Sequence, residues 1–518
     1  MRRLLLSLFI LALLVGCSSE GASKSKSGGK KDGDSTLNVA YMAQPPTFDP
    51  HMTTAVATRD IMRNVFETLL SVDENNEVVP LLADSFEFSD NFRDVTFKLR
   101  KGVKFHNGQE MTADDVVASM NRWKTTNGQA NAYLSKSEFV KEDDYTVVLH
   151  MDKPYTIIKY LLAMDSNFAG IMPKEVIENA DKTGVKEYIG TGPFKFDEWK
   201  QDQFVKMSKN EEYQSSSETV DGLVGLREAL VDDLVINFVS DSQTRMSGIQ
   251  TGEYDVALAI PSDNVPQLEN DPNVNVHIAP GGYTVLIFNK KKGLFTDLKA
   301  RQAVNLAVEK EAVMLSAFTN DHFYTLEGGL LGEAFPSWKN DEGLKEYNAY
   351  DPEAAKKLLK EAGYNGEKIR LITTRDYEDQ YQSAVVVQQY LEKIGVNVDL
   401  QVYDWPSLME LREDENNFDL QAFAFAPATN PINFYYLDSR DDYSGWSNSP
   451  EIDKYNDELK VAKTDEEASK AFASLQKATW EYLPAIKYGE YNRVTVARSN
   501  LEGFKWFNGP LFWNVEKK

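Results

Sequence analysis

The amino-acid sequence predicts an α/β protein, because segments with the apolar spacing of strands alternate with segments that have the spacing of helices. The clearest case is a strand–helix–strand unit, with strands expected at 368–377 and 396–402 and a helix expected at 381–394. In addition, the segment 351–364 has the start and stop signals of a helix. We expect the two strands of the unit to be joined by a right-handed crossover.

The helix signals are specific residues at the expected ends. Asp351 is in the cap position, Pro352 opens the first turn, and Gly363 is at the end of the same segment. Another expected helix begins at Thr112 and has Asp115 three positions later, which is a capping-box pattern. These signals place the helix boundaries more firmly than apolar spacing alone.

Apolar periodicity and turn residues predict the other elements along the chain. The expected strands are at 37–41, 94–105, 143–151, 254–260, 283–289 and 418–426, and a hairpin is expected at 194–207. The expected helices are at 58–70, 112–123, 242–251, 297–318 and, for most of its length, 453–483. The glycine pairs Gly281-Gly282 and Gly328-Gly329 are expected to mark turns.

The N-terminal segment has the pattern of a signal peptide. Arg2 and Arg3 precede an apolar run at 4–15 that is too short to cross a bilayer. The run ends at Gly16-Cys17, which resembles the bacterial lipobox, so we expect residues 1–16 to be removed and Cys17 to be lipidated. The alternative is a signal peptide with an incidental cysteine. Residues 17–36 are rich in Ser, Gly and Lys, which predicts a flexible tether.

Composition and motifs exclude several function classes. The formal net charge of −24 argues against binding to a phosphate backbone, so no nucleic acid is expected as a partner. The five histidines form no HxxxH or HExxH motif, and GxGxxG, Walker and GxSxG motifs are absent from the sequence. We therefore expect neither an enzyme nor a bound cofactor or metal.

The segment 97–123, FKLRKGVKFHNGQEMTADDVVASMNRW, resembles the motif of family 5 solute-binding proteins. Further segments that resemble this family follow the same order along the chain, at 63–90, 189–199, 248–257, 283–289, 301–308 and 350–364. The resemblance runs from about Leu37 to the end of the sequence. Members of the family are the extracytoplasmic receptors of ABC importers for peptides, nickel and related solutes.

The resemblance implies a two-lobe periplasmic-binding-protein fold of type II, cluster C, with an additional domain inserted in the first lobe. It also implies that the ligand cleft lies between the lobes and closes by a hinge motion. The expected domains are lobe I at 37–66, 190–280 and 490–518, the inserted domain at 67–189, and lobe II at 281–489.

The resemblance also implies ligand contacts. Dipeptide-type members pair the ligand carboxylate with an Arg that corresponds to Arg375; the alternative is a loop cation neutralised by Asp376 or Glu378. The Asp with which those members hold the ligand ammonium is replaced by Pro427. Because 421–437 contains neither Asp nor Glu, an ammonium group would need a carboxylate from another segment.

Aromatic and amide side chains complete the expected ligand site. Each aromatic residue has the alternative role of a core residue. The turn at Gln44-Pro45-Pro46 corresponds to a first-lobe segment near the ligand, and Asn430 offers an uncharged amide. The expected site residues besides Arg375 and Pro427 are Gln44, Pro45, Tyr283, Phe423, Phe425, Ala426, Asn430 and Trp446.

The sequence thus predicts a substrate-binding receptor of an ABC importer that captures a peptide or peptide-like solute and delivers it to a permease. The alternatives within this class are glutathione, an opine, a sugar or a metal chelate. A signalling or chaperone receptor on the same fold is a different class, and an enzyme is a third. We expect a monomer that is anchored to the cell membrane through Cys17.

Overall fold

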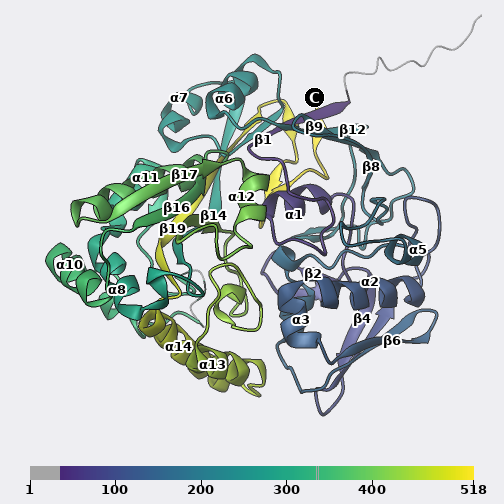
Figure 1. The fold of residues 1–518 in the computed structure, drawn as a ribbon. Coiled ribbons are helices and arrows are strands. Elements are labelled where there is room, and N and C mark those ends of the chain that lie inside the picture. Colours follow the sequence, from purple (N-terminus) through teal and green to yellow (C-terminus); the bar gives the residue numbers. More distant parts are fainter. Residues whose placement is uncertain (1–34, 334, 336–337) are drawn as a thin grey trace, which may run out of the picture. The chain divides into compact units, whose positions relative to one another are not determined.

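Two long antiparallel strands, β14 (Val274–Phe288) and β19 (Ala485–Arg498), run side by side through the middle of an eleven-stranded sheet (Figure 1). The structure is a computed structural model that describes residues 35–333, 335 and 338–518. The predicted signal peptide at 1–16, the predicted lipidation site Cys17 and nearly all of the predicted tether at 17–36 lie outside the described residues. Residues 36–518 form one unit, and the description below concerns that unit.

Eight other strands of the large sheet flank β14 and β19 on two sides, and the short strand β15 (Tyr324–Thr325) pairs with β19. We call one flank the first sheet half, and it consists of β13 (Val256–Leu258), β1 (Thr36–Tyr41), β12 (Asp233–Phe238), β9 (Phe204–Lys209) and β8 (Phe194–Lys200). The second sheet half consists of β18 (Leu420–Phe425), β16 (Lys368–Thr374) and β17 (Asn397–Tyr403). Helices lie between many of these strands along the chain, so the fold belongs to the predicted α/β class.

Strand register makes β14 and β19 the connection between the two halves. Strand β13 pairs with the C-terminal end of β19, where Leu258 is opposite Thr495. Strand β18 pairs with the C-terminal end of β14, where Tyr283 is opposite Phe425. Because β14 and β19 are antiparallel, these two pairings lie at opposite ends of the central strand pair. Between these pairings β14 has a register shift next to Gly282. The turn predicted at Gly281-Gly282 is wrong, because the pair lies inside β14.

The strand–helix–strand unit predicted in the second half is confirmed. Strands β16 and β17 are parallel neighbours, and α11 (Glu378–Lys393) connects them and packs on both. The helix predicted at 297–318 is instead two helices, α8 (Leu298–Ala307) and α9 (Lys310–Phe318), separated by extended backbone. Each packs on a different partner: α8 on α10 (Pro352–Glu361), and α9 on α11 and β19.

The segment between β1 and β8 contains a separate antiparallel sheet. Its strands are β4 (Ala83–Phe88), β5 (Asp94–Leu99), β7 (Thr146–His150) and β6 (Glu138–Asp143), in this order. Helix α2 (Ala113–Thr126) packs on β6 and β7 and begins with the predicted capping box of Thr112 and Asp115.

Helix α1 is shorter than the sequence predicts. It spans Val56–Met62 rather than 58–70. The Asn64 side chain donates hydrogen bonds to the carbonyl oxygens of Asp60 and Ile61. These bonds satisfy carbonyls that a longer helix would have used, so the chain leaves the helix there.

The remaining helices and strands complete the described elements. The helices are α3 (Gly128–Leu134), α4 (Ile158–Leu162), α5 (Lys174–Glu178), α6 (Ser242–Thr251), α7 (Val265–Leu268), α12 (Trp405–Leu411), α13 (Pro450–Lys460) and α14 (Asp465–Tyr482). The strands are β2 (Leu70–Val72), β3 (Val78–Pro80), β10 (Val220–Asp221), β11 (Val224–Gly225), β15 (Tyr324–Thr325), β20 (Leu501–Glu502), β21 (Lys505–Trp506), β22 (Pro510–Leu511) and β23 (Glu516–Lys517).

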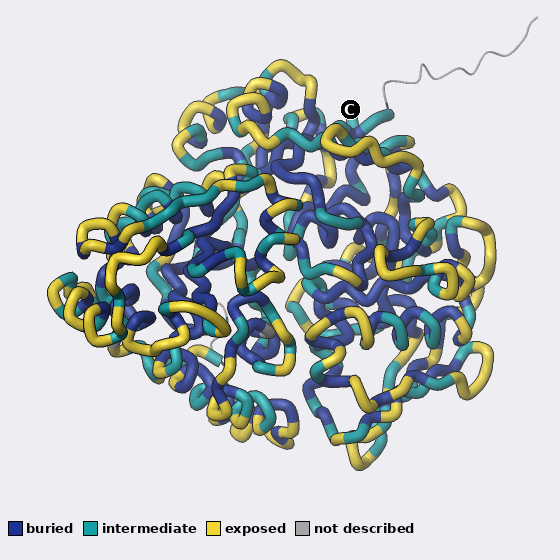
Figure 2. The backbone as a smooth tube through the Cα atoms, in the orientation of Figure 1, coloured by how far each residue is buried: buried dark blue, intermediate teal, exposed yellow. Residues whose placement is uncertain are grey.

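Buried residues follow the strands of the large sheet, and exposed residues concentrate on the outer helices and loops (Figure 2). The β14 segment Tyr283–Phe288 is buried at every position. Over residues 35–333, 335 and 338–518, we find no helix that combines the length and apolar character needed to span a membrane.

Candidate ligand-binding cavity

A cavity of about 750 Å³ is lined by segments that lie far apart in the sequence. Its volume is in the range typical of small-molecule sites. The lining residues come from 46–56 after β1, from 126–129 and 166–167 near α2 and α3, and from the second sheet half with β19. A solute in this cavity would therefore contact the segment after β1, the region of α2 and α3, and the second sheet half at the same time.

Aromatic side chains form one continuous wall of the cavity. The Trp405 and Phe423 rings are stacked with centroids 5.6 Å apart, and Tyr377 meets the Trp405 ring edge-on at 4.6 Å. Phe425 lies 5.1 Å from Phe423 on the same face of β18. These aromatic rings are uncharged, and they provide apolar contact area for a solute.

A smaller pocket of about 40 Å³ adjoins this wall. Tyr283 and Pro427 line it together with Phe425 and Ala426, which line the large cavity as well. Tyr283 is stacked on Phe425 with ring centroids 5.2 Å apart. The structure thus brings together five residues that the sequence places at the ligand site: Tyr283, Phe423, Phe425, Ala426 and Pro427.

The other expected site residues occupy different surroundings. Arg375 is exposed, and its guanidinium donates to the Tyr381 hydroxyl at 2.7 Å and lies over the same ring. Trp446 is stacked on Phe418 at 5.8 Å. Among the described residues that line the large cavity, neither Arg375 nor Trp446 occurs.

The N-terminal turn contributes to the cavity through a different proline. Pro46 lines the cavity, whereas the Gln44 amide holds the β8–β9 turn: its oxygen accepts from the Trp199 indole at 3.1 Å and from the Asp202 N–H at 2.7 Å. Pro45 is next to it in the chain. The Asn430 side chain accepts from the Ile432 N–H at 3.1 Å and so shapes the loop after β18.

Arginines that the sequence did not single out line the cavity. Arg412 lies over the rings of Phe423 and Tyr443, at 4.8 and 4.4 Å from their centroids. Arg493 lies on β19, and its Nη2 donates to the Tyr491 hydroxyl at 2.8 Å. These residues could not be found from local patterns, because only the folding of β19 beside β14 places Arg493 next to the aromatic wall.

A carboxylate also lines the cavity. Asp441 lies just beyond the 421–437 segment that lacks acids, and both of its carboxylate oxygens are buried without a hydrogen-bond partner in the described chain. Burial and the nearby Asp438 raise its pKa, although Lys460 and Arg440 act in the opposite direction. The Asp441 carboxyl group therefore favours its neutral form.

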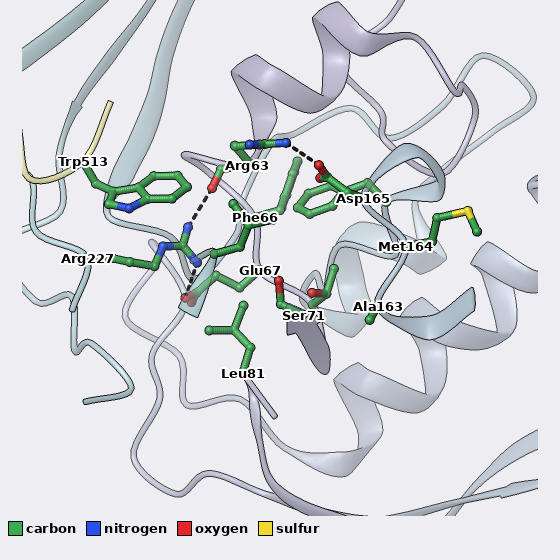
Figure 3. Close-up of a pocket in the computed structure, with 13 residues that line it drawn as sticks. Arg63, Phe66, Glu67, Ser71, Leu81, Ala163, Met164, Asp165, Arg227 and Trp513 are labelled. Atoms are coloured by element: carbon green, nitrogen blue, oxygen red, sulfur yellow. Dashed lines mark hydrogen bonds and ion pairs between the residues drawn. The ribbon is translucent and has the colours of Figure 1, made fainter. Parts of the chain in front are cut away.

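A third pocket, of about 20 Å³, has space for one water and is built from structural ion pairs (Figure 3). Arg227 pairs with Glu67 at 3.3 Å and donates to the Arg63 carbonyl, while its guanidinium lies over the Trp513 ring. Both Arg227 and Glu67 are almost fully buried. The geometry indicates a role in stability rather than in ligand capture.

A cavity lined by the segment after β1 and by the second sheet half, next to a pair of long strands that both sheet halves share, defines a solute-binding protein of the two-lobe type. The chain belongs to the bacterial extracellular solute-binding proteins, family 5, whose model matches residues 77–448. The family and the fold class that the sequence predicts are both confirmed.

Curated relatives match the chain over most of its length. The chain is 30% identical to a probable peptide ABC transporter periplasmic-binding protein of Sinorhizobium fredii, over 93% of this chain and 94% of that protein. It is 27% identical to the oligopeptide-binding protein AppA of Bacillus subtilis, over 98% and 97%.

Solved structures share the fold. The structure of Bacillus subtilis AppA in complex with a nonapeptide has a TM-score of 0.80 and 24% identity, and covers 93% of this chain and 99% of that one. A dipeptide-binding protein from Pseudoalteromonas in complex with Met-Leu has a TM-score of 0.81 at 24% identity, with coverage of 93% and 100%. At this identity the likeness concerns the fold alone.

Proposed function

We propose that the protein is the substrate-binding receptor of an ABC importer and that it captures a peptide or peptide-like solute. The observation that carries this proposal is the 750 Å³ cavity with its aromatic wall, which is lined by the segment 46–56 after β1, by 126–129 and 166–167, and by the second sheet half with β19. The relatives named for peptide and oligopeptide binding support the choice of solute. The protein binds and releases its solute unchanged, as expected of a family of solute-binding proteins.

Capture proceeds by a hinge motion about β14 and β19. The two sheet halves are joined through these strands, and the register shift beside Gly282 lies between the two sets of pairings. A solute that contacts both halves stabilises the closed state by its differential affinity. The lobes proposed to move are lobe I at 37–66, 190–280 and 490–518 with the inserted domain at 67–189, and lobe II at 281–489.

The receptor delivers its solute from outside the cytoplasm. Lipidation of Cys17 and the tether at 17–36 hold it on the membrane beside its permease, and it acts as a monomer. Replacing Cys17 with Ser should release the protein from the membrane fraction. Retention of the variant in that fraction would contradict the anchor.

Native mass spectrometry of protein purified from its host cells tests the solute class, because closed receptors retain bound solute. Retained peptides, together with a smaller radius of gyration on adding them to emptied protein, are the expected result. Retention of glutathione, an opine, a sugar or a metal chelate would replace the peptide proposal by that alternative. Hydrolysis of added peptides by the pure protein would overturn the receptor role.

A further inference from the structure

Arg493 lies at the point where the two sheet halves meet. On β19 it is paired with Ala279 of β14, beside the register shift that begins after Pro280. A Cβ atom on Gly281 would lie 3.0 Å from the Arg493 Cβ and 2.4 Å from the Tyr491 ring. The absence of a side chain at Gly281 therefore makes room for the Tyr491 and Arg493 side chains, both of which line the cavity.

The Arg493 guanidinium is held by aromatic residues rather than by acids. Its Nη2 donates to the Tyr491 hydroxyl at 2.8 Å, and its carbon lies 5.5 and 5.8 Å from the ring centroids of Tyr491 and Tyr377. Within the described chain, no carboxylate lies at ion-pair distance from Arg493, and its Nε and Nη1 donate to no acceptor. Two donors of a cavity-lining cation thus have no protein partner.

The charge of Arg493 persists although the residue is half-buried. Burial lowers the pKa of the guanidinium, but Tyr491, Asp379 and Tyr377 outweigh this effect and raise the pKa above its ordinary value. Asp379 is itself half-buried, and this burial raises the pKa of its carboxyl group, which weakens it as a counter-ion. A half-buried charge without a close partner is incompletely solvated, so an anion that reached it would be bound favourably.

The other charged side chains of the cavity do not compete for the same anion. Glu410, Glu413 and Asp442 are exposed acids on the wall formed by α12 and the loop after β18. Arg412 lies between the rings of Phe423 and Tyr443 and is within 3.6 Å of the Glu413 carboxylate. Arg493 is thus the cavity arginine without an acid beside it.

We propose that Arg493 pairs with a carboxylate of the bound solute. The guanidinium fork suits a carboxylate, which can accept from Nη2 together with either Nε or Nη1, because Nη2 has a second N–H besides the one donated to Tyr491. This inference rests on the proposed peptide function and moves the anion contact from Arg375, where the family resemblance placed it, to β19. The carboxylate belongs either to the C-terminus of a peptide or to an acidic side chain.

Two random tripeptide libraries distinguish these sources. One has free C-terminal carboxylates and the other has C-terminal amides, and each is incubated with emptied protein and analysed by native mass spectrometry. We expect the carboxylate library to be retained about tenfold more strongly, because a hydrogen-bonded charge pair contributes that much or more. If a side-chain carboxylate is used instead, the retained amides should be enriched in Asp and Glu.

Variants then assign the preference to Arg493. Arg493→Gln should abolish the preference for carboxylates, Arg493→Lys should keep part of it, and Arg375→Gln, which changes an exposed arginine outside the cavity lining, should leave it intact. Since the wild-type comparison needs no variant, a poorly folded Arg493→Gln does not end the test.

Each outcome has a separate meaning. Equal retention of both libraries without enrichment of Asp and Glu would overturn the carboxylate contact while leaving the peptide function in place. A preference that Arg375→Gln abolishes and Arg493→Gln preserves would overturn the assignment to Arg493. Retention of neither library would overturn the peptide function, and this inference with it.

Discussion

A Cβ atom added to Gly282 would lie 1.8 Å from the carbonyl oxygen of Phe425. Gly282 has a φ angle of +139° and lies at the register shift of β14, and Phe425 is the last residue of β18 and lines the cavity. The close approach of these two backbones sets the distance between β14 and the aromatic wall. The glycine is therefore required by sterics and by backbone conformation together.

Replacing Gly282 with Ala should destabilise the protein by about 2 kcal/mol or more. The backbone conformation alone costs about 1–3 kcal/mol for a residue with a side chain, and β18 must also move to relieve the overlap with Phe425. Urea unfolding followed by circular dichroism measures the loss. Gly366→Ala is the control: its φ is +93° and its Cβ would meet nothing within 4 Å, so about 1–2 kcal/mol is expected. A loss for Gly282→Ala no larger than for this control would contradict the steric argument.

Glu67→Gln should lower the free energy of unfolding by about 3–5 kcal/mol, because it leaves the buried Arg227 charge without its carboxylate. The change also weakens the hydrogen bonds that Thr191 and Tyr213 donate to Glu67 at 2.7 and 2.8 Å. The same unfolding experiment on Glu212→Gln provides a matched control. Its ion pair with Lys104 has the same 3.3 Å distance but is exposed, so less than about 1 kcal/mol is expected. Similar losses in the two variants would refute a special role of burial.

Local signals in the sequence predicted much of the fold. Asp351 accepts a hydrogen bond from the Ala354 N–H, and Asp115 accepts one from the Thr112 N–H, at the two helix starts where capping was expected. These predictions succeed because a cap depends on residues three positions apart. The break between α8 and α9 was missed, since it arises from packing on two different partners and has no glycine or proline to mark it.

The site was predicted only in part, for a physical reason. Phe423 and Phe425 were found because alternation on β18 shows which side chains share a face. Arg493 was missed because its place in the cavity depends on the pairing of β19 with β14, about two hundred positions earlier in the chain. Arg375 is one residue beyond the end of β16, where strand alternation no longer determines the direction of a side chain.

Trp405→Ala should weaken peptide binding about tenfold or more. Trp405 lines the cavity, is stacked on Phe423 and is met edge-on by Tyr377, so its removal deletes the centre of the aromatic wall. Calorimetry with a retained peptide, well below the unfolding temperature, gives the affinity. Trp446→Ala also removes a stacked indole, but one that packs on Phe418 outside the cavity lining, and it should change the affinity less than about twofold. Equal losses in both variants would show that the wall has no direct part in binding.

Asp441→Asn should stabilise the peptide-free protein at neutral pH and have little effect in acid. Burial and Asp438 raise the pKa of the Asp441 carboxyl group, so the folded state holds the proton more tightly than the unfolded state does. Below the unfolded-state pKa of about 3.9 the carboxyl group is protonated in both states, so it costs the wild type no stability. As the pH rises from this value to the higher folded-state pKa, the free energy of unfolding of the wild type decreases. Asparagine has no such dependence, since its side chain stays neutral.

The melting temperatures of the two proteins should agree near pH 3 and diverge above about pH 4, with the variant higher. Glu410→Gln, which changes an exposed acid of the same cavity, should not reproduce this divergence. A variant that melts below the wild type at pH 7 would mean that the Asp441 carboxylate is ionised and stabilising, contrary to the burial argument.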